Sequence, residues 1–292
     1  MNSNDLQKFE TQRALMFSIA YRMLGSVAEA EDILQEAFLR YQNTSRAEIV
    51  STKAFLSAVV TRLCINRLTS AQNQRETYLG PWLPEPILTM PAESADAVQR
   101  LELHESLSMA FLILLEQLTP FERAVFLLRQ VFDYEYQEIA EVIGRDEGAC
   151  RQLFSRAKKH IAENRPRFKP NPEAQREMLE RFIAAVRAGE VEGLLQLLSA
   201  DVRLWIDGGG KARGAALEPL HGREAVARFV IAAPRLAMGP LEPHIVMVNG
   251  EPALLLRTEG QARFVVMISV DQTNVSEIRI MGNPDKLKGV AQ

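Results

Sequence analysis

One short stretch of the chain joins residue types that can do chemistry. An apolar run from Leu204 to Ile206 is followed by an acid, three glycines and a lysine, Asp207 to Lys211. An acid at the end of a strand could act as a general base in an apolar pocket, and glycines followed by lysine could bind a phosphate. A phosphate-binding loop has the spacing G-x-x-x-x-G-K with Ser or Thr next, whereas Ala212 follows the lysine here. The spacing therefore argues against a nucleotide site.

Asp207 is the best candidate for a catalytic base, with His221 and His244 as weaker candidates. A histidine is more often a surface residue or a hydrogen-bonded core residue than a catalyst. The four histidines show no spacing typical of metal ligands. We therefore predict no metal and no cofactor, although an apolar cavity could hold an unidentified small ligand.

The composition is that of a globular protein whose charge is local rather than global. The chain has 292 residues, enough for two or three domains. Its formal net charge of −3 excludes a uniformly basic nucleic-acid-binding protein, so any contact with nucleic acid must come from local basic faces. Cys64 and Cys150 show no pairing pattern, and the sequence contains neither a signal peptide nor a run of roughly 20 apolar residues. We expect reduced thiols and a cytoplasmic location.

Helical patterns and a proline-rich linker fill the first part of the chain. Residues 5–74 contain no proline, and the segment from Ala28 to Tyr41 has apolar residues at helical spacing. A second helix is predicted over Thr52 to Ala71. Three prolines between Pro81 and Pro86 then favour an extended linker. Helices are predicted to resume at about Ala97.

A helix-turn-helix is predicted farther along the chain. Thr119-Pro120 marks a helix start, Tyr136 to Ile143 is a short apolar helix, and a turn containing glycine joins it to a helix over Glu147 to Ile161. The second helix has a basic outward face, whose arginine and glutamine side chains can bond base edges while its lysines suit phosphates. A solvated charged helix is the alternative. Because the turn, the apolar helix and the basic face occur together, the pattern favours DNA binding.

After a second proline-rich linker, Arg165 to Glu173, helices are followed by strands. One helix leads to the strand that ends at Asp207, a short helix follows, and four strand-like runs come after it. Asn249-Gly250 between two of these runs predicts a hairpin turn. Helices followed by an antiparallel sheet indicate an α+β domain.

Two segments of the helical part carry a family resemblance. EAEDILQEAFLRY together with KAFLSAVVTRLCINRL resembles region 2 of bacterial sigma factors of the extracytoplasmic-function group, and LTPFERAVFLLRQVFDYEYQEIAEVIGRDEGACRQLFSRAKKHI resembles their region 4. The resemblance implies that region 2 binds the clamp of core RNA polymerase and the −10 promoter element, and that region 4 binds the −35 element. The residues implied are Asp32, Gln35, Glu36 and Phe38 for the polymerase, Lys53, Arg62, Asn66 and Arg67 for the −10 element, and Arg145, Arg151, Gln152, Ser155, Arg156, Lys158 and Lys159 for the −35 element.

The rest of the chain resembles a SnoaL-like domain, a cone-shaped α+β fold with a curved antiparallel sheet. Three motifs together are similar to the sigma-J type of the group, which has such a domain fused after region 4, and this implies a regulator in cis whose motifs face the linker. The motifs are WLPEP (Trp82, Leu83, Pro84, Glu85 and Pro86), DGGGK (Asp207, Gly208, Gly209, Gly210 and Lys211) and NPDKL (Asn283, Pro284, Asp285, Lys286 and Leu287). We expect Trp82 to anchor the linker and Glu85 to pair with Lys211 or Lys286.

The sequence thus predicts a multidomain chain. Residues 1–80 form region 2 as a helical bundle, 81–96 a linker, 97–165 region 4, 166–174 a second linker, and 175–292 the SnoaL-like regulatory domain. We expect a transcription initiation factor rather than an enzyme, with core RNA polymerase and promoter DNA as partners. The alternative is a helix-turn-helix protein fused to a small-molecule-binding or isomerase-type domain, and a ligand-responsive repressor is a weaker one.

Overall fold

The computed structural model describes residues 3–45, 49–75, 78–89, 106–164, 172–212, 214–236, 239–271 and 273–290. The chain forms two compact units. Unit 1 comprises Met1–Glu76 and Phe111–Arg165, and unit 2 comprises Thr77–Ala110 and Pro166–Gln292. The segment 77–110, called the connector below because it joins the two predicted sigma regions, therefore belongs to the same unit as the C-terminal part of the chain.

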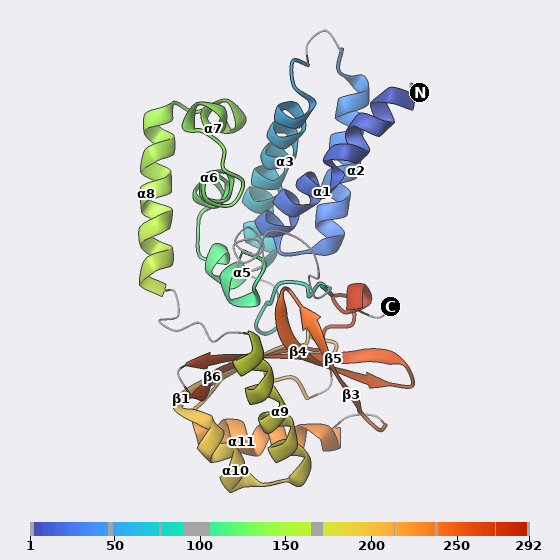
Figure 1. Cartoon of the computed structure of the whole chain (residues 1–292), viewed down its shortest axis with the longest axis vertical. Helices are drawn as coiled ribbons and strands as arrows, with labels where there is room; N and C mark the ends of the chain where they lie inside the picture. Colours follow the sequence, from blue (N-terminus) through green and yellow to red (C-terminus); the bar gives the residue numbers. More distant parts are fainter. Residues whose placement is uncertain are drawn as a thin grey trace. The chain divides into compact units, whose positions relative to one another are not determined.

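The first half of unit 1 is a bundle of α1 (Ser3–Leu24), α2 (Val27–Asn43) and α3 (Thr52–Arg75), which pack on one another (Figure 1). The N–H groups of a first helical turn have no partner within the helix, and the Ser26 side chain accepts one of them, from Glu29, at 3.3 Å. The apolar stripes of the helices meet in a core. Its buried residues include Met16, Ile19, Ile33, Leu34, Leu56 and Val60.

The second half of unit 1 contains the predicted helix-turn-helix. α6 (Pro120–Gln130) begins with a capping box between Thr119 and Glu122. α7 (Tyr136–Ile143) ends at Gly144, whose φ of 67° is left-handed, and α8 (Glu147–Asn164) follows. α5 (Met109–Glu116) precedes them. The earlier part of the helix predicted from Ala97 lies largely outside the described residues.

Unit 2 is an α+β domain with one six-stranded sheet. The strands are β1 (Leu198–Asp207), β2 (Leu220–His221), β3 (Glu242–Val248), β4 (Glu251–Thr258), β5 (Gln261–Asp271) and β6 (Asn274–Met281), in the order β2-β1-β6-β5-β4-β3. The helices are α9 (Pro172–Ala188), α10 (Val191–Leu197) and α11 (Arg223–Ala232), with short 3-10 turns at Ala233–Leu236 and Lys288–Val290.

The sheet differs from the predicted antiparallel sheet in one pairing. β1 runs parallel to β6, with Leu204 opposite Ile278, while the other neighbouring strands are antiparallel. The pairing is parallel because β1 meets the last strand of the meander across the long crossover through α11. The predicted hairpin turn is confirmed, since Asn249 and Gly250 join β3 to β4 with φ values of 53° and 79°.

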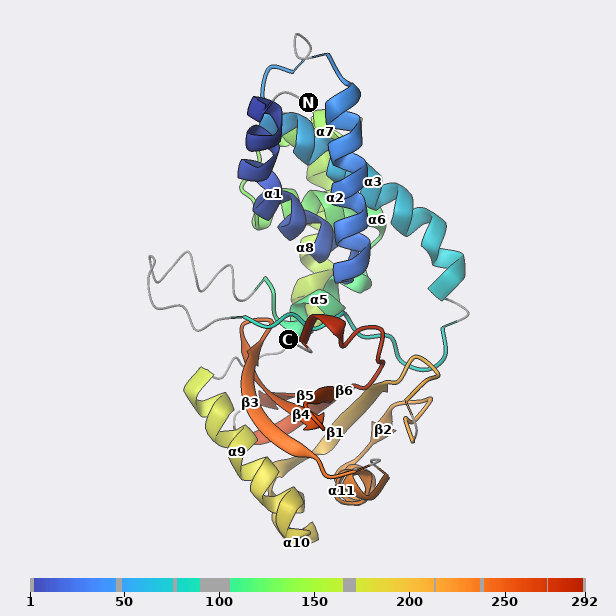
Figure 2. The same cartoon turned by 90° about the vertical axis from the view of Figure 1, so that its right-hand side faces the viewer.

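The helices of unit 2 cover one face of the sheet (Figure 2). α9 packs on β4 and β5, and α11 packs on β1. Between them lies an apolar core that includes Met178, Phe182, Leu204, Ile206, Val226, Leu254 and Ile278.

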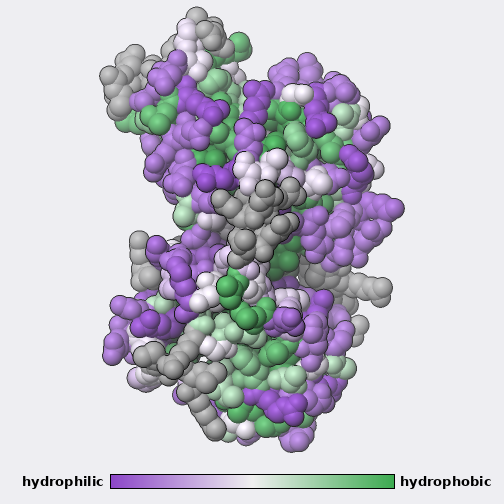
Figure 3. Space-filling model, turned by 180° about the vertical axis from the view of Figure 1, so that it is seen from behind, coloured by the Kyte–Doolittle hydropathy of each residue, from purple (hydrophilic) through white to green (hydrophobic). Residues whose placement is uncertain are grey.

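The surface drawn in Figure 3 is largely hydrophilic, with smaller hydrophobic areas between the polar side chains. Among the described residues, no helix combines the length and the apolar character that crossing a membrane requires.

Candidate functional site: DNA-binding helices and a docked connector

The predicted −35 residues all lie on the outside of the helix-turn-helix. α8 buries Cys150, Leu153, Ala157 and Ile161 against its neighbours. A helix that buries one stripe exposes the opposite face. The exposed residues are Arg145, Arg151, Gln152, Ser155, Arg156, Lys158 and Lys159.

Aromatic rings hold two of these cations in place. Arg151 lies 4.6 Å from the ring centre of Tyr136 and pairs with Glu147 at 2.5 Å. Arg145 lies 4.3 Å from the ring centre of Phe121. Both contacts are in the range of cation–π interactions. Tyr136 was missed by the sequence analysis, because its closeness to Arg151 depends on how α7 crosses α8.

Two of the predicted −10 residues contact the second half of unit 1. Arg62 on α3 donates from Nε to the Val142 carbonyl at 2.7 Å and from a terminal nitrogen to the Glu141 carbonyl at 2.6 Å. These carbonyls belong to the last turn of α7, where helix carbonyls lack partners and carry partial negative charge. Lys53 Nζ lies 5.3 Å from the ring centre of Tyr134.

The other two predicted −10 residues do not make such contacts among the interactions described. Asn66 is exposed, and Arg67 lies 3.8 Å from Glu29 in the neighbouring helix α2. The structure therefore brings Lys53 and Arg62, but not the whole set, against the helix-turn-helix half.

Buried polar contacts strengthen this packing inside unit 1. Ser57 Oγ and Tyr134 Oη share a hydrogen bond of 2.6 Å in a fully buried position. Arg123 on α6 donates to the Met23 carbonyl at 2.5 Å and pairs with Glu116 at 2.8 Å. Burial lowers the pKa of Arg123 to about 10, so the guanidinium stays charged at neutral pH and needs these partners.

The predicted polymerase-binding residues lie on α2. Asp32, Gln35 and Glu36 are exposed, whereas Phe38 is half-buried and packs on Phe9 with ring centres 4.8 Å apart. Leu39, which the sequence analysis did not select, is 57% exposed on the same helix. Leu39 therefore lies on the exposed face of α2 that also carries Asp32, Gln35 and Glu36.

In unit 2, the connector is bound to the C-terminal domain through Asp207. This carboxylate is fully buried. It accepts hydrogen bonds from Tyr78 Oη at 2.5 Å and from the Leu83 backbone N–H at 2.8 Å, and it pairs with Lys286 Nζ at 2.7 Å. One acid therefore joins the WLPEP, DGGGK and NPDKL motifs.

Lys286 and Tyr78 extend the same cluster. Lys286 also donates to the Leu83 carbonyl at 2.7 Å and lies 4.1 Å from the ring centre of Trp82. Burial and the hydrogen bond to Asp207 raise the pKa of Tyr78, so its hydroxyl remains a donor. Asn283 Nδ2 donates to that hydroxyl at 2.9 Å.

Gly209 is required where the loop passes this cluster. Its φ of 55° is left-handed, and a Cβ on it would collide with the Asn283 side chain. The backbone approaches closely here, which explains the glycines after Asp207 without a phosphate.

Lys211 pairs with Asp285, and Lys286 pairs with Asp207. The expected pairing of Glu85 with one of these lysines stays a prediction. Trp82 is half-buried, whereas Leu83 beside it is only 3% exposed. Leu83 is therefore the more deeply buried of the two side chains, and Trp82 lies over the Lys286 ammonium.

The remaining motif residues divide between buried and exposed positions. The buried residues are Pro84, Glu85, Pro86, Gly208 and Leu287. The exposed residues are Gly210, Lys211, Pro284 and Asp285, and Lys286 is half-buried. The buried ones come from all three motifs.

The geometry does not favour a catalytic base at Asp207. Side chains alternate along a strand, and Leu204 and Ile206 point into the core of the cone. Asp207 therefore projects from the other face of the sheet. His221 and His244 are exposed, on β2 and β3 at opposite edges of the sheet. Among the described residues, no three or more His, Cys, Asp or Glu side chains are grouped to hold a metal ion.

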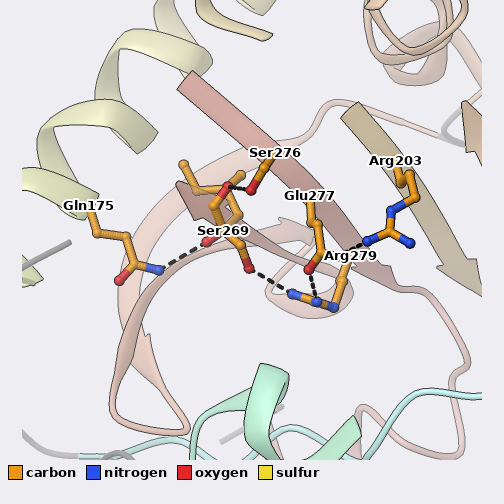
Figure 4. A network of polar contacts seen from close by, with 7 residues as sticks. Gln175, Arg203, Ser269, Ser276, Glu277 and Arg279 are labelled. Atoms are coloured by element: carbon orange, nitrogen blue, oxygen red, sulfur yellow. Dashed lines mark hydrogen bonds and ion pairs between the residues drawn. The ribbon is translucent and has the colours of Figure 1, made fainter. Parts of the chain in front are cut away.

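A second polar network occupies the same strands (Figure 4). Arg279 is 6% exposed, donates to Ser269 Oγ at 2.8 Å and pairs with Glu277. Arg203 bonds the same glutamate at 2.8 Å, and both arginines lie near the ring of Trp205. The glutamate neutralises the buried guanidinium, so the network fixes the β1–β6 pairing.

A helical bundle and a helix-turn-helix, joined in the chain by a connector that an α+β domain binds, define an RNA polymerase sigma factor with a fused C-terminal domain. The sigma-70 region 2 family matches residues 9–74, and the sigma-70 region 4 family matches residues 108–161. The chain is 35% identical to the ECF RNA polymerase sigma factor SigJ of Mycobacterium tuberculosis, over 98% of this chain and 94% of that protein. It is 30% identical to a probable ECF sigma factor, SigI, of the same species, over 96% and 93%.

The crystal structure of Mycobacterium tuberculosis SigJ superimposes with a TM-score of 0.74 at 33% identity, covering 97% of this chain and 98% of that one. The chain belongs to the extracytoplasmic-function sigma factor family. It is a transcription initiation factor that directs RNA polymerase to promoters. The predicted fold class, two helical sigma regions followed by an α+β cone, is confirmed.

Proposed function

We propose that the α+β domain controls initiation in cis by holding the connector between region 2 and region 4. The observation that carries this proposal is the buried Asp207 carboxylate with its three donors, Tyr78, Leu83 and Lys286. Two of these donors lie in the connector. A buried charge is tolerated only when it is fully paired, so the connector is part of the domain's own stability.

The two sigma regions must separate for promoter binding. The −10 and −35 elements are about 25 base pairs apart, which corresponds to about 85 Å of DNA. In unit 1, Arg62 and Lys53 of region 2 are occupied by region 4. We therefore assign this closed form to the free factor. The form that binds DNA is an open one, in which regions 2 and 4 have separated.

In the open form, the exposed face of α8 would bind the −35 element, and Lys53, Arg62, Asn66 and Arg67 would bind the −10 strand. Cationic side chains that bond carbonyls and rings in the closed form would be transferred to phosphates and bases. The polymerase clamp would bind the exposed face of α2, which carries Asp32, Gln35, Glu36 and Leu39. Phe38 would support that face by packing on Phe9.

Run-off transcription with core polymerase tests the role in cis. Trp82→Ala removes the ring over Lys286, and Lys286→Met removes the partner of Asp207. Lys211→Glu is the control, because Lys211 and Asp285 are both more than half exposed and such pairs contribute little. We expect the first two changes to alter the transcript yield several-fold and the control to alter it less. Equal effects of all three, or the largest effect from Lys211→Glu, would contradict the proposal.

A further inference from the structure

The β3–β4 hairpin turn has a second role besides reversing the chain. Asn249 is fully buried although it is a turn residue. Its backbone N–H donates to the Ile87 carbonyl at 2.9 Å, and its Oδ1 accepts from the Ile87 N–H at 3.1 Å. One turn residue therefore satisfies both backbone polar groups of a connector residue. Buried backbone polar groups need partners, and here the turn supplies them to the connector.

The neighbouring residues continue this contact as a short stretch of β pairing. Leu88 pairs with Val248 in an antiparallel bridge, and the Thr89 N–H donates to the Met247 carbonyl at 2.9 Å. The Gly250 N–H donates to Thr89 Oγ1 at 3.0 Å. The connector therefore adds to the end of an edge strand, a form of recognition that depends on backbone geometry.

The same asparagine also binds the far end of the connector. Its Nδ2 donates to the Leu107 carbonyl at 3.0 Å. The region 4 match begins one residue later, at 108, and α5 begins at Met109. At the near end, Tyr78 is bound to Asp207, three residues after α3 ends at Arg75. Along the chain, the two ends of the connector that the domain binds are therefore within three residues of α3 and within two residues of α5.

We propose that Asn249 is a positioning residue through which the fused domain restricts the spacing between the −10 and −35 elements that the factor accepts. This inference rests on the proposed role in cis. Each base pair added to the spacer moves the two elements apart by about 3.4 Å and rotates one against the other by about 35°. The factor can follow such a change only if the chain between its two DNA-binding regions can extend or rotate.

How far the two regions can move apart depends on the length of chain that the domain does not hold. Residues 77–110 as a flexible segment would have a root-mean-square length of about 30–35 Å and a maximum reach above about 100 Å, so a few base pairs would cost little. With Tyr78 and Leu107 held, two residues separate Tyr78 from the end of α3 and one separates Leu107 from the start of α5, which limits the slack to the order of 10 Å in all. A held connector therefore selects one spacer length, and a released one accepts several.

The experiment uses run-off transcription by the full chain with core polymerase. The template is a promoter that the unmodified chain selects from a randomised DNA pool, rebuilt with spacers one or two base pairs shorter or longer. Asn249→Gly removes the side-chain amide but keeps the turn, because glycine readily adopts a φ of 53°. The matched control is Glu259→Gly in the β4–β5 turn, where the exposed Glu259 has a φ of 52°.

We expect the unmodified chain and Glu259→Gly to lose at least about tenfold in yield at a change of two base pairs, equal to about 1.4 kcal/mol. Asn249→Gly should lose less than about threefold over the same series. Asn249→Asp keeps the acceptor for Ile87 and loses the donor to Leu107, so its profile should be intermediate. It also provides the test if the glycine variant does not fold, as judged by its circular dichroism and melting temperature.

A spacer profile for Asn249→Gly that is as narrow as that of the unmodified chain overturns the inference. If its yield changes equally at every spacer, the domain acts in cis without restricting spacing, and the proposed function stands alone. If Trp82→Ala and Lys286→Met also leave the yield unchanged, the proposed function itself fails. If the Asn249→Asp variant folds and its spacer profile is identical to that of the unmodified chain, the contact of Asn249 with Leu107 does not restrict the spacing.

Discussion

The carboxylate of Asp207 combines full burial with a negative charge, so its environment must supply compensating donors. Lys286 supplies the opposite charge, and Tyr78 and the Leu83 N–H supply hydrogen bonds, all within 2.8 Å. Removing one member of a buried ion pair costs more than the pair itself contributes, because the other charge is left buried. The stability of unit 2 should therefore depend strongly on this one acid.

We predict that Asp207→Asn lowers the free energy of unfolding of unit 2 by about 3 kcal/mol, because Lys286 loses its charge partner in a position that is only 12% exposed. Urea unfolding followed by tryptophan fluorescence measures the change, since Trp82 and Trp205 both lie in unit 2. Asp285→Asn is the control, since Asp285 pairs with Lys211 at the surface. An equal loss in both variants would show that Asp207 has no special role.

The role of such a residue can be predicted from the sequence only when the residues that contact it lie close to it in the chain. Gly209 could be selected from the sequence as a loop residue, but its reason, the nearby Asn283, lies 74 positions away. The face of the sheet from which the Asp207 side chain projects could not be predicted without knowing which face the helices cover. Lys286 was associated with the connector through its motif, but its contact with Asp207 was not predicted, because a motif does not show which atoms meet.

At the scale of elements, local signals were sufficient for the helix-turn-helix. α7 has the predicted bounds, because Gly144 after it adopts a left-handed conformation that ends the helix. The parallel β1–β6 pairing was not predicted, since neighbouring strands in the sequence favour hairpins. The contacts of Arg62 with α7 join residues about 80 positions apart, and no periodicity within one helix indicates them.

The charge pattern along α8 gives a prediction for DNA binding. Lys158 and Lys159 are exposed near the end of the helix, where they suit phosphates, whereas Gln152 lies nearer its start, where it suits a base edge. We predict that Lys158→Gln reduces by about one the slope of log affinity against log salt for the holoenzyme on its promoter. The change should be similar on altered −35 sequences.

Gln152→Ala provides the contrast on the same helix. It should leave the salt slope nearly unchanged and reduce the discrimination against altered −35 bases by about 1–3 kcal/mol. Fluorescence anisotropy with labelled promoter DNA at several salt concentrations measures both quantities. If Lys158→Gln changed base preference and Gln152→Ala changed the salt slope, the assignment of the helix to the major groove would be wrong.

At the scale of the whole molecule, the free factor has to change from a closed unit 1 to an open form on the promoter. The closed form is held by specific polar contacts: the Ser57–Tyr134 hydrogen bond, the two bonds from Arg62 and the buried Arg123. A hydrogen bond between neutral groups, such as Ser57–Tyr134, contributes about 0.5–1.5 kcal/mol, and one made by a charged group, such as those of Arg62 and Arg123, contributes about 1.5–3 kcal/mol. We expect these contacts together to keep the free factor closed, and polymerase binding to supply the free energy that breaks them.

Tyr134→Phe removes the hydroxyl bonded to Ser57 while keeping the ring under Lys53, so it should weaken the closed form by about 1 kcal/mol. We predict a several-fold increase in the open population of the free factor. Energy transfer between dyes at Lys8→Cys on α1 and Glu163→Cys on α8 measures this, because both positions are exposed and both native cysteines are buried. Transfer should fall in the variant, and should fall further in both proteins when core polymerase is added.

Tyr136→Phe is the matched control for this experiment. It makes the same chemical change on the next tyrosine of the chain, whose ring contacts Arg129, Arg151 and Phe154 within the helix-turn-helix half. Its transfer in the free factor should equal that of the unmodified chain. If Tyr134→Phe behaves like this control, the buried hydroxyl pair does not hold the regions together. If added polymerase leaves the transfer unchanged, the closed form is the one that binds polymerase, and opening must be assigned to the promoter instead.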